Sequence, residues 1–466
     1  MTHQPPSPNQ SITPVSYTIN NDGQACLGNI PLSNLATQFG TPLYVHDVET
    51  IRQMAAAYTD SLKTNYKGEH CVLFASKANL NLALCGLADQ LGLGLDVVSG
   101  GELYAAYQAG FPSERIYFNG NNKSADELRL ALDKSIGAIT VDSTDELHRL
   151  ARIAQEHPRY GDLNNPKHKV NILIRVCPGI ECHTHEYIQT GQDDTKFGIG
   201  MHELPPLLHA LTHEYKDLIA LKGLHAHIGS QIFEEQPFYD LARLMLNIYY
   251  NIRQDYDIIL PELNLGGGYG IAYTPQDDPP HIPSLMERIA QRLNDYAVKI
   301  DFPPPKLLLE PGRSLIATSG MTLYTAGCSK TVPNIRKFVA LDGGMGDNIR
   351  PSLYQAQYSA VVADKANQPP EETITLAGKY CESGDLLIQH WDAPKIEDGD
   401  TIAIFATGAY GESMASNYNK IPRPACVWVD NGEISLVTRR ETYDDLLRRD
   451  LVPESIQKGR AGKKTT

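Results

Sequence analysis

The chain has 466 residues, too many for one ordinary domain, so we expect two or three domains. Its content of 42% hydrophobic and 21% charged residues is typical of a globular protein. The net charge of −14 argues against a general nucleic-acid binder or a protein of anionic membranes. No apolar run approaches the roughly 20 residues that a membrane-spanning helix needs.

The two ends and the cysteines carry few signals. The first residues, MTHQPPSPNQSITP, are rich in Pro, Ser and Gln without an apolar core, which predicts a flexible leader and a cytoplasmic protein. A basic tail, residues 456–466, is expected to be solvated. The eight cysteines form no CxxC pair. The two Cys and two His of the segment CPGIECHTHEY (177–187) could bind a metal, but their spacing matches no common ligand pattern, so we favour a loop in which they occur incidentally.

From about residue 70 to 315, short β-type runs alternate with helical patterns. The β-type runs are 72–76, 93–99, 115–120, 138–143, 170–176, 219–229, 263–268 and 306–312, and the clearest helical patterns are 125–135, 144–157 and 238–254. Strands that alternate with helices imply parallel β-α units. Eight units predict an α/β fold of the (β/α)8 TIM barrel type rather than an open, doubly wound sheet.

After about residue 318 the pattern is mainly strand-like. The runs are MTLYTAGCSKTV, RKFVALDGG, DTIAIFATGAY and ACVWVDNGEISLVTRRE, and Asn431-Gly432 in the last is a hairpin signal. We therefore expect a C-terminal, mainly antiparallel β domain. The expected division is a leader with N-terminal strands that join the β domain (1–45), a cofactor-binding barrel (46–317), the β domain (318–455) and the tail (456–466).

The ends of the predicted barrel strands carry reactive side chains, and barrel chemistry takes place at those ends. They are Lys77, Asp96, Asn119 to Lys123, Asp142, Arg175, His225, His227, Glu310 and Arg313. Lys77 follows the apolar run in CVLFASKANL. Taken alone it could extend to solvent, or it could be an amine that forms a Schiff base with a carbonyl.

Glycines and a carboxylate follow the last two predicted strands. GGGYG (266–270) and EPGR (310–313) lie where barrels commonly bind phosphate, and GGGYG is not a dinucleotide fingerprint. His227 could be a core histidine or could stack on an aromatic ring, and Glu310 could pair with an arginine or with a protonated ring nitrogen. With Lys77, these groups together predict a site for pyridoxal 5'-phosphate (PLP).

A series of motifs places the chain near a known family. They are SKAN (76–79), DVVSGGEL, GNNKS, RVCPGIECHTHEYIQTG with KFG, GLHAHIGSQI, LNLGGGYG, EPGR, DNIRPSLYQAQY (347–358), CESGD (381–385) and TGAYGESMASNYNKIPRP (407–424). From about residue 40 to 430 the chain resembles the barrel-type PLP-dependent decarboxylases, whose fold is related to that of alanine racemase. Within them it is most similar to the diaminopimelate decarboxylase family. FASKAN, RVCPG and MGDNIRP depart slightly from the family pattern without removing a required group.

The resemblance implies roles for individual residues. Lys77 carries the cofactor, His227 stacks on its ring and Glu310 bonds its nitrogen. The implied phosphate ligands are Ser230, Gly267, Gly268, Gly312, Arg313 and Tyr410. The implied substrate ligands are Arg313, Arg350, Tyr354, Glu382 and Tyr410. Cys381 is the implied catalytic proton donor, contributed with Glu382 by the second subunit of a homodimer, and no metal is implied.

The implied reaction is the PLP-dependent decarboxylation of meso-2,6-diaminopimelate to L-lysine and CO2, the last step of lysine biosynthesis. A carboxylate at Glu310 favours decarboxylation over racemisation because it keeps the ring nitrogen protonated. The alternatives are decarboxylation of another basic amino acid or carboxylated polyamine (ornithine, arginine, carboxynorspermidine), and a non-catalytic PLP carrier. From the residues alone, Arg350 is equally a surface arginine, Cys381 an inert thiol and Tyr410 a packed aromatic.

Overall fold

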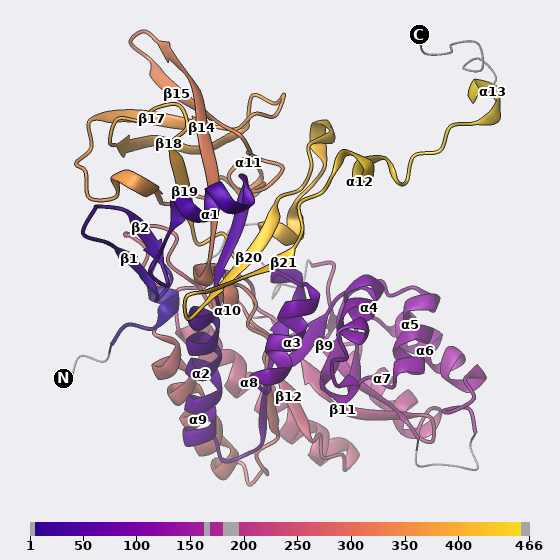
Figure 1. Ribbon diagram of the computed structural model, residues 1–466. Helices are drawn as coiled ribbons and strands as arrows, with labels where there is room; N and C mark the ends of the chain where they lie inside the picture. The colour runs from indigo at the N-terminus through magenta and orange to yellow at the C-terminus, as the bar shows by residue number, and fades with distance from the viewer. Residues whose placement is uncertain (1–4, 163–167, 180–194, 458–466) are drawn as a thin grey trace.

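The chain forms two bodies, which are shown in Figure 1. The computed structural model describes residues 5–162, 168–179 and 195–457. The lower body in the view is a barrel surrounded by helices, and the upper body is built mainly of strands. The segment CPGIECHTHEY lies mostly outside the described residues, as does most of the basic tail. Cys26, Cys71, Cys85, Cys328, Cys381 and Cys426 are free thiols.

Parallel strands close the lower body into a barrel. They are β5 (His70–Ala75), β6 (Gly94–Val97), β7 (Ile116–Phe118), β8 (Ala138–Val141), β9 (Val170–Cys177), β11 (Ile219–His225), β12 (Glu262–Asn264) and β13 (Lys306–Leu309). Closure comes from the pairing of β13 with β5, while β8 pairs with β9. The predicted (β/α)8 barrel is therefore confirmed, and the open doubly wound sheet is excluded. A short strand, β10 (Ile199–Gly200), adds to the edge of β9.

Helices cover the outside of the barrel. They are α2 (Val48–Asn65), α3 (Leu82–Gln90), α4 (Gly100–Gln108), α5 (Ala125–Lys134), α6 (Thr144–Glu156), α7 (Leu204–His213), α8 (Gln236–Tyr256) and α9 (Ile282–Lys299), while the short helix α10 (Arg313–Ile316) follows β13 at the mouth of the barrel. Ser99, Ser124 and Ser143 cap α4, α5 and α6 by accepting a backbone N–H of the first turn, which is the usual way a helix start is satisfied. Within the described residues, none of the helices has the length and apolar character needed to cross a bilayer.

A mixed sheet forms the upper body. Its strands are β4 (Leu43–Asp47), β14 (Gly320–Val332), β15 (Arg336–Leu341), β16 (Ala360–Val362), β17 (Glu372–Ala377), β18 (Leu386–Ala393), β19 (Thr401–Phe405), β20 (Ala425–Asp430) and β21 (Glu433–Thr438). Most pairs are antiparallel, and the exceptions are β15 with β17 and β20 with β4. The β20–β21 hairpin turns at Asn431 and Gly432, both with positive φ, as the Asn-Gly signal predicts. The mainly antiparallel β domain is confirmed.

The N-terminal residues differ from the predicted flexible leader. The predicted flexible leader is wrong for residues 5–14, because Asn9 is fully buried and its Nδ2 donates to the carbonyls of Gly270 and Pro280 at 3.1 and 3.0 Å. Beyond it lie β1 (Tyr17–Ile19), β2 (Ala25–Leu27) and β3 (Ile30–Pro31), which form a sheet of their own, and α1 (Leu32–Phe39). Of the N-terminal strands, β4 is the one that enters the large sheet.

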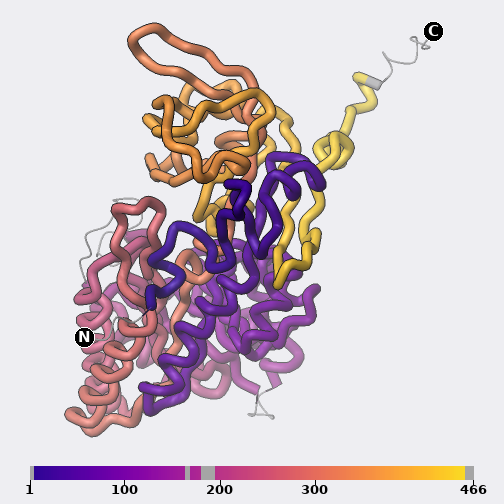
Figure 2. Tube along the Cα trace, turned by 60° about the vertical axis from the view of Figure 1, so that its left-hand side comes forward, coloured from indigo at the N-terminus to yellow at the C-terminus, as the bar shows by residue number. Residues whose placement is uncertain are grey.

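Residues 439–457, which follow β21, extend from the upper body and are here called the arm. The arm carries two short helices, α12 (Tyr443–Leu447) and α13 (Glu454–Gln457). Figures 1 and 2 show the arm extending away from both bodies in two views. Several large apolar side chains of the arm are exposed, among them Leu451 at 91%.

One strand-end residue does not face the mouth of the barrel. Lys123 is buried in the wall, where its Nζ lies 2.7 Å from Glu146 Oε1 and donates to the carbonyls of Gly120 and Thr140. The two side chains are 1% and 4% exposed. The expected place of Lys123 among the reactive residues is therefore wrong: it ties the loop after β7 to α6.

We expect Lys123→Met to lower the free energy of unfolding by about 3–5 kcal/mol, because it leaves the Glu146 carboxylate buried without a cation. The measurement is urea unfolding followed by circular dichroism. The matched control is the double variant Lys123→Met/Glu146→Leu, which removes both charges and should recover most of the loss. An equal loss in the double variant would assign the effect to packing instead.

Candidate active site

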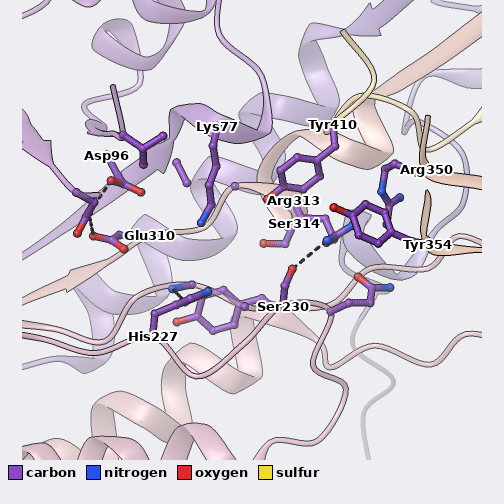
Figure 3. A pocket seen from close by; sticks show the side chains of 18 of the residues that line it. Lys77, Asp96, His227, Ser230, Glu310, Arg313, Ser314, Arg350, Tyr354 and Tyr410 are labelled. Carbon is purple, nitrogen blue, oxygen red and sulfur yellow. Dashed lines mark hydrogen bonds between the residues drawn. The ribbon is translucent and has the colours of Figure 1, made fainter. Parts of the chain in front are cut away.

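A cavity of about 740 Å³ opens at the carboxyl ends of the barrel strands. Its walls come from the strand ends and from the upper body, which contributes Arg350, Tyr354 and Tyr410. In Figure 3, Asp96 and Glu310 lie on one side of the Lys77 amine, and Arg313, Arg350 and the tyrosines lie on the other. The cavity therefore has an acidic end and a basic end.

The two-residue period of the strands explains which side chains reach the cavity. Leu73, Tyr117, Leu173 and Leu308 form an apolar layer inside the barrel. Side chains two positions further along a strand point to the same side. These are Ala75, Asn119, Arg175 and Glu310, and all of them line the cavity. The apolar layer is thus the floor on which the polar layer stands.

Lys77 rises from this floor at the end of β5. It lies in a single 3-10 turn, Ser76–Ala78, whose other two residues are buried, so the lysine alone projects into the cavity. Its side chain is accessible from the cavity. In Figure 3 its amine points toward His227. The geometry leaves the amine free to reach a carbonyl carbon bound above the histidine.

Three side chains hold the Glu310 carboxylate. Asn119 and Asn264 donate to Oε1 at 3.0 and 2.7 Å, and His225 Nε2 lies 2.9 Å from Oε2. Burial would raise the pKa of Glu310, but His225 and Asn264 outweigh it and lower the pKa to about 2. Glu310 is therefore an ionised carboxylate in a buried place, able to accept a strong hydrogen bond.

Asp96 is the neutral counterpart of Glu310. Asn119 bridges the two acids, because its Nδ2 also donates to Asp96 Oδ1 at 2.6 Å. Burial and the charge of Glu310 raise the pKa of Asp96 well above its ordinary value. Two neighbouring carboxyl groups with opposed pKa shifts are typical of a reactive site.

His227 supplies a flat, uncharged surface below the lysine. Burial and the charge of Lys77 hold the pKa of His227 well below its ordinary value, so the imidazole is neutral. The backbone N–H of Gly267 donates to its Nδ1 at 3.2 Å, which fixes the ring plane. A neutral imidazole held in this way can stack on an aromatic ring.

Ser230 and the glycine loop after β12 form a small concave wall. A Cβ on Gly267 would overlap the carbonyl oxygen of Glu310, and Gly268 has a φ of +108° that side chains rarely adopt. Gly267, Gly268, Gly312 and the Ser230 side chain all line the cavity here. Backbone without side chains, beside a hydroxyl and Arg313, suits a phosphate group.

The basic end of the cavity holds two guanidinium groups. Arg313 donates to Tyr273 Oη at 2.6 Å and to Ser230 Oγ at 2.9 Å, and Arg350 donates to Tyr358 Oη at 2.6 Å. Both arginines are at most 8% exposed, and neither forms an ion pair within the described residues. Arg350 begins the short helix α11 (Arg350–Tyr354). Because its side chain is buried, its interpretation as a surface arginine is wrong.

The pKa of Tyr273 shows the effect of the two positive charges. Burial raises the pKa of its hydroxyl, yet Arg313 and Arg350 together bring that pKa below the ordinary tyrosine value. Buried positive charges are costly unless an anion compensates them. The basic end is therefore built to receive anionic groups.

Two of the expected site residues lie elsewhere. Cys381 and Glu382 are exposed and do not line the cavity of this chain. Asp142 also stands back from it: it accepts the backbone N–H of Gly198 at 2.9 Å and lies 3.8 Å from Arg175, which does line the cavity.

Other cavity residues were not predicted from the sequence. They are Tyr273, Phe197 and Ser314, and the hydrogen-bond partner of Glu310, Asn264, was not predicted either. The role of Asn264 was not predicted because the pattern LNLGGG indicates only a strand followed by glycines. An asparagine in a buried strand does, however, indicate that a polar partner lies nearby.

PLP binding needs an amine, a stacking partner for the ring, a carboxylate for the ring nitrogen and a place for the phosphate. The cavity offers Lys77, the neutral ring of His227, the ionised Glu310 and the recess lined by glycines, Ser230 and Arg313. The barrel and its cavity thus define the class of barrel-type PLP enzymes. Residues 48–317 match the family described as pyridoxal-dependent decarboxylase, pyridoxal-binding domain.

Known proteins narrow this class. The chain is 46% identical to a diaminopimelate decarboxylase of Bacillus subtilis over 93% of this chain and 96% of that one. It is 44% identical to a diaminopimelate decarboxylase of Synechocystis over 97% and 95% of the two chains. A solved structure of the M. jannaschii diaminopimelate decarboxylase in complex with L-lysine superposes with a TM-score of 0.85 at 34% identity, covering 95% of this chain and 99% of that one. The chain belongs to the diaminopimelate decarboxylase family, which confirms the resemblance seen in its motifs.

We expect borohydride reduction of the PLP-loaded protein to fix a pyridoxyl group on the peptide that contains Lys77, because this amine is accessible in the cavity. Peptide mass spectrometry after digestion locates the label. Lys123 serves as the internal control, since its ion pair and burial should leave it unmodified. A label that persists in Lys77→Ala would contradict the assignment.

Proposed function

We propose that the chain removes CO2 from meso-2,6-diaminopimelate and yields L-lysine, with PLP held at Lys77. The family membership and the residues of the cavity that suit PLP support this reaction. The observation that carries the choice of substrate is the pair of buried arginines, Arg313 and Arg350, without an ion-pair partner among the described residues. A substrate with a second amino-carboxylate group supplies an anion for that end.

PLP, when bound, supplies an acceptor for the electron pair left behind as CO2 departs. Glu310 would hold the proton of its ring nitrogen by a charge-assisted hydrogen bond, and the low pKa of Glu310 keeps the acceptor ionised. His227 would stack on the ring. Ser230, Gly267, Gly268, Gly312 and Arg313 would bind the phosphate, with the Tyr410 hydroxyl beside them.

Substrate selection is assigned to the basic end. The guanidinium of Arg350 presents a planar fork suited to a carboxylate, and Tyr354 and Tyr410 line the cavity close to it. Arg313 lies between this fork and the phosphate recess, so it contributes positive charge to both. The Lys77 amine would rebind the cofactor in place of the product amine, which is thereby released.

We assign the remaining groups, Cys381 as proton donor and Glu382 as a ligand for the distal ammonium, to a second copy of the chain. Their exposure outside the cavity of their own chain supports this assignment. The arm supports a homodimer as well, because Tyr443 and Leu451 are 76% and 91% exposed and apolar groups of this size are usually covered. A cytoplasmic location stays a prediction.

The alternatives differ in what they need from the cavity. A decarboxylase of ornithine, arginine or carboxynorspermidine has no use for a fork that binds a second α-carboxylate. A non-catalytic carrier has no use for the wall that the upper body contributes through Arg350, Tyr354 and Tyr410.

We expect Arg350→Ala to raise KM for diaminopimelate by about 10- to 100-fold, the value of a hydrogen bond to a charged group. Its effect on lysine or ornithine, which lack the distal carboxylate, should be much smaller. The measurement is CO2 release from each compound. Arg350→Lys is the matched variant, because it keeps the charge and loses the fork. Equal effects on all substrates would favour another basic amino acid.

We expect two inactive variants, Lys77→Ala and Cys381→Ala, to restore each other's activity when mixed and allowed to exchange subunits. Each mixed dimer then holds one complete site, so about one quarter of wild-type activity should return. The assay is CO2 release after co-expression or exchange. No recovery, although mixed dimers form, would place Cys381 in its own chain's site.

A further inference from the structure

Side chains that could bind a metal ion lie next to the segment 76–79, here called the lysine loop, and outside the cavity described above. They are His46 on β4, Cys426 on β20 and Glu412 in the turn Glu412–Met414 that follows Tyr410. In the parallel β4–β20 pair, Cys426 is aligned with Tyr44 and Trp428 with His46. Side chains alternate along a strand, so His46 and Cys426 share one face, and Leu43, Val45 and Val427 occupy the apolar face opposite.

The three side chains converge on one point. One ligand atom from each lies within 4.8 Å of the other two. His46 and Cys426 are 2% and 0% exposed, and Glu412 is partly accessible. Donor atoms around a tetrahedral Zn²⁺ are about 3.3–3.8 Å apart, given ligand bonds of about 2.0–2.3 Å. A side-chain movement of about 1 Å therefore closes the site.

Hydrogen bonds prepare the histidine and the carboxylate as ligands. Ser319 donates its hydroxyl to the carbonyl of Ile316 at 2.7 Å, so at His46 Nδ1, 3.0 Å away, it accepts. Nδ1 thus carries the proton, and the lone pair of Nε2 faces the cluster. Thr438 likewise orients Glu412 by donating to Oε1 at 3.0 Å. Such outer partners are typical of metal ligands.

Without a cation, the Cys426 thiol donates a hydrogen bond to the Glu412 carboxylate, and zinc binding would replace this contact with loss of the thiol proton. The other contacts come from one amide nitrogen, Asn79 Nδ2, which is shared between His46 Nε2 at 3.5 Å, Glu412 Oε2 at 3.4 Å and the carbonyl of Gly408 at 3.3 Å. Asn79 is 1% exposed, and its Oδ1 has no hydrogen-bond partner in the structure. Within the described part of the chain, no lysine or arginine forms an ion pair with Glu412.

We propose that His46, Glu412 and Cys426 bind a Zn²⁺ ion, with the fourth position taken by a water or by the Asn79 oxygen after its amide turns to point Oδ1 instead of Nδ2 at the cluster. Imidazole, thiolate and carboxylate together are a zinc ligand set. The ion joins β4 and β20 of the upper body to the segment that carries Tyr410. That segment already holds the lysine loop, since Tyr410 N and Ser413 Oγ donate to the carbonyl of Ala78 at 2.7 and 3.0 Å.

The site is structural rather than catalytic. Its ligands lie behind Asn79, two positions after Lys77, and none of the three lines the active-site cavity. The ion would fix the lysine loop of the barrel against the Tyr410 segment of the upper body. These two segments form facing walls of the cavity that would hold the cofactor.

The test is the metal content of the full-length, PLP-loaded protein after incubation with Zn²⁺ and removal of excess metal. We expect about one Zn²⁺ per chain by elemental mass spectrometry, and X-ray absorption showing one sulfur at about 2.3 Å with lighter ligands at about 2.0 Å. The ion should be lost in His46→Gln, Glu412→Gln and Cys426→Ala. It should remain in Cys328→Ala, an exposed thiol on β14, and in Cys182→Ala, in the segment CPGIECHTHEY.

Three results would overturn the proposal. They are substoichiometric zinc in the wild-type protein, zinc that Cys426→Ala retains, and an absorption spectrum without sulfur. Loss of zinc in Cys182→Ala alone would assign the metal to the other segment. If a variant fails to fold, the wild-type absorption spectrum decides alone. Removal of bound zinc by a chelator should also lower the thermal unfolding midpoint, and the Glu412→Gln protein should not respond.

Discussion

The active site depends on one ionised carboxylate kept inside the barrel. Glu310 stays charged although it is buried, because His225 on β11, Asn264 on β12 and Asn119 after β7 supply compensating donors. Parallel strands make this possible, since they bring residues far apart in the chain to one edge. The same carboxylate pushes the neighbouring Asp96 toward its neutral form. The acidic end of the cavity is thus set by a single charge, and the basic end by two guanidinium groups from the other wall.

Much of this arrangement was predictable from the sequence. The apolar runs of β5 and β13 identify strands, and a polar residue of the cavity follows each one: Glu310 lies in the layer next to the apolar floor, and Lys77 lies in the turn just beyond β5. The hairpin at Asn431-Gly432 was visible because these two residues tolerate positive φ. Local signals of this kind, periodicity and turn chemistry, depend on few neighbours and can be read without a structure.

The features that were missed depend on long-range contacts. Lys123 follows a strand as Lys77 does, but the partner that draws it into the wall, Glu146, is set by the packing of α6. Asn9 looked like part of a free leader, because its acceptors lie in a distant loop. Tyr273 takes its role from arginines on α10 and α11. The strand β16 is short, and polar residues interrupt the apolar pattern of β17 and β18, so the sequence signal of these strands is weak. In each case the deciding partner is remote in the sequence.

The position of β4 has a consequence for synthesis of the chain. This strand, made before the barrel, pairs with β14 and β20, which are made after it. While the ribosome builds the barrel, Leu43 and Val45 have no sheet to enter, and the upper body cannot be completed until nearly the whole chain has emerged. The barrel is an insertion between the two halves of its neighbour. A nascent chain that ends after the barrel therefore exposes the apolar strand β4 with both edges unpaired. Unpaired, apolar strand edges promote aggregation, and chaperones bind folding intermediates of this kind.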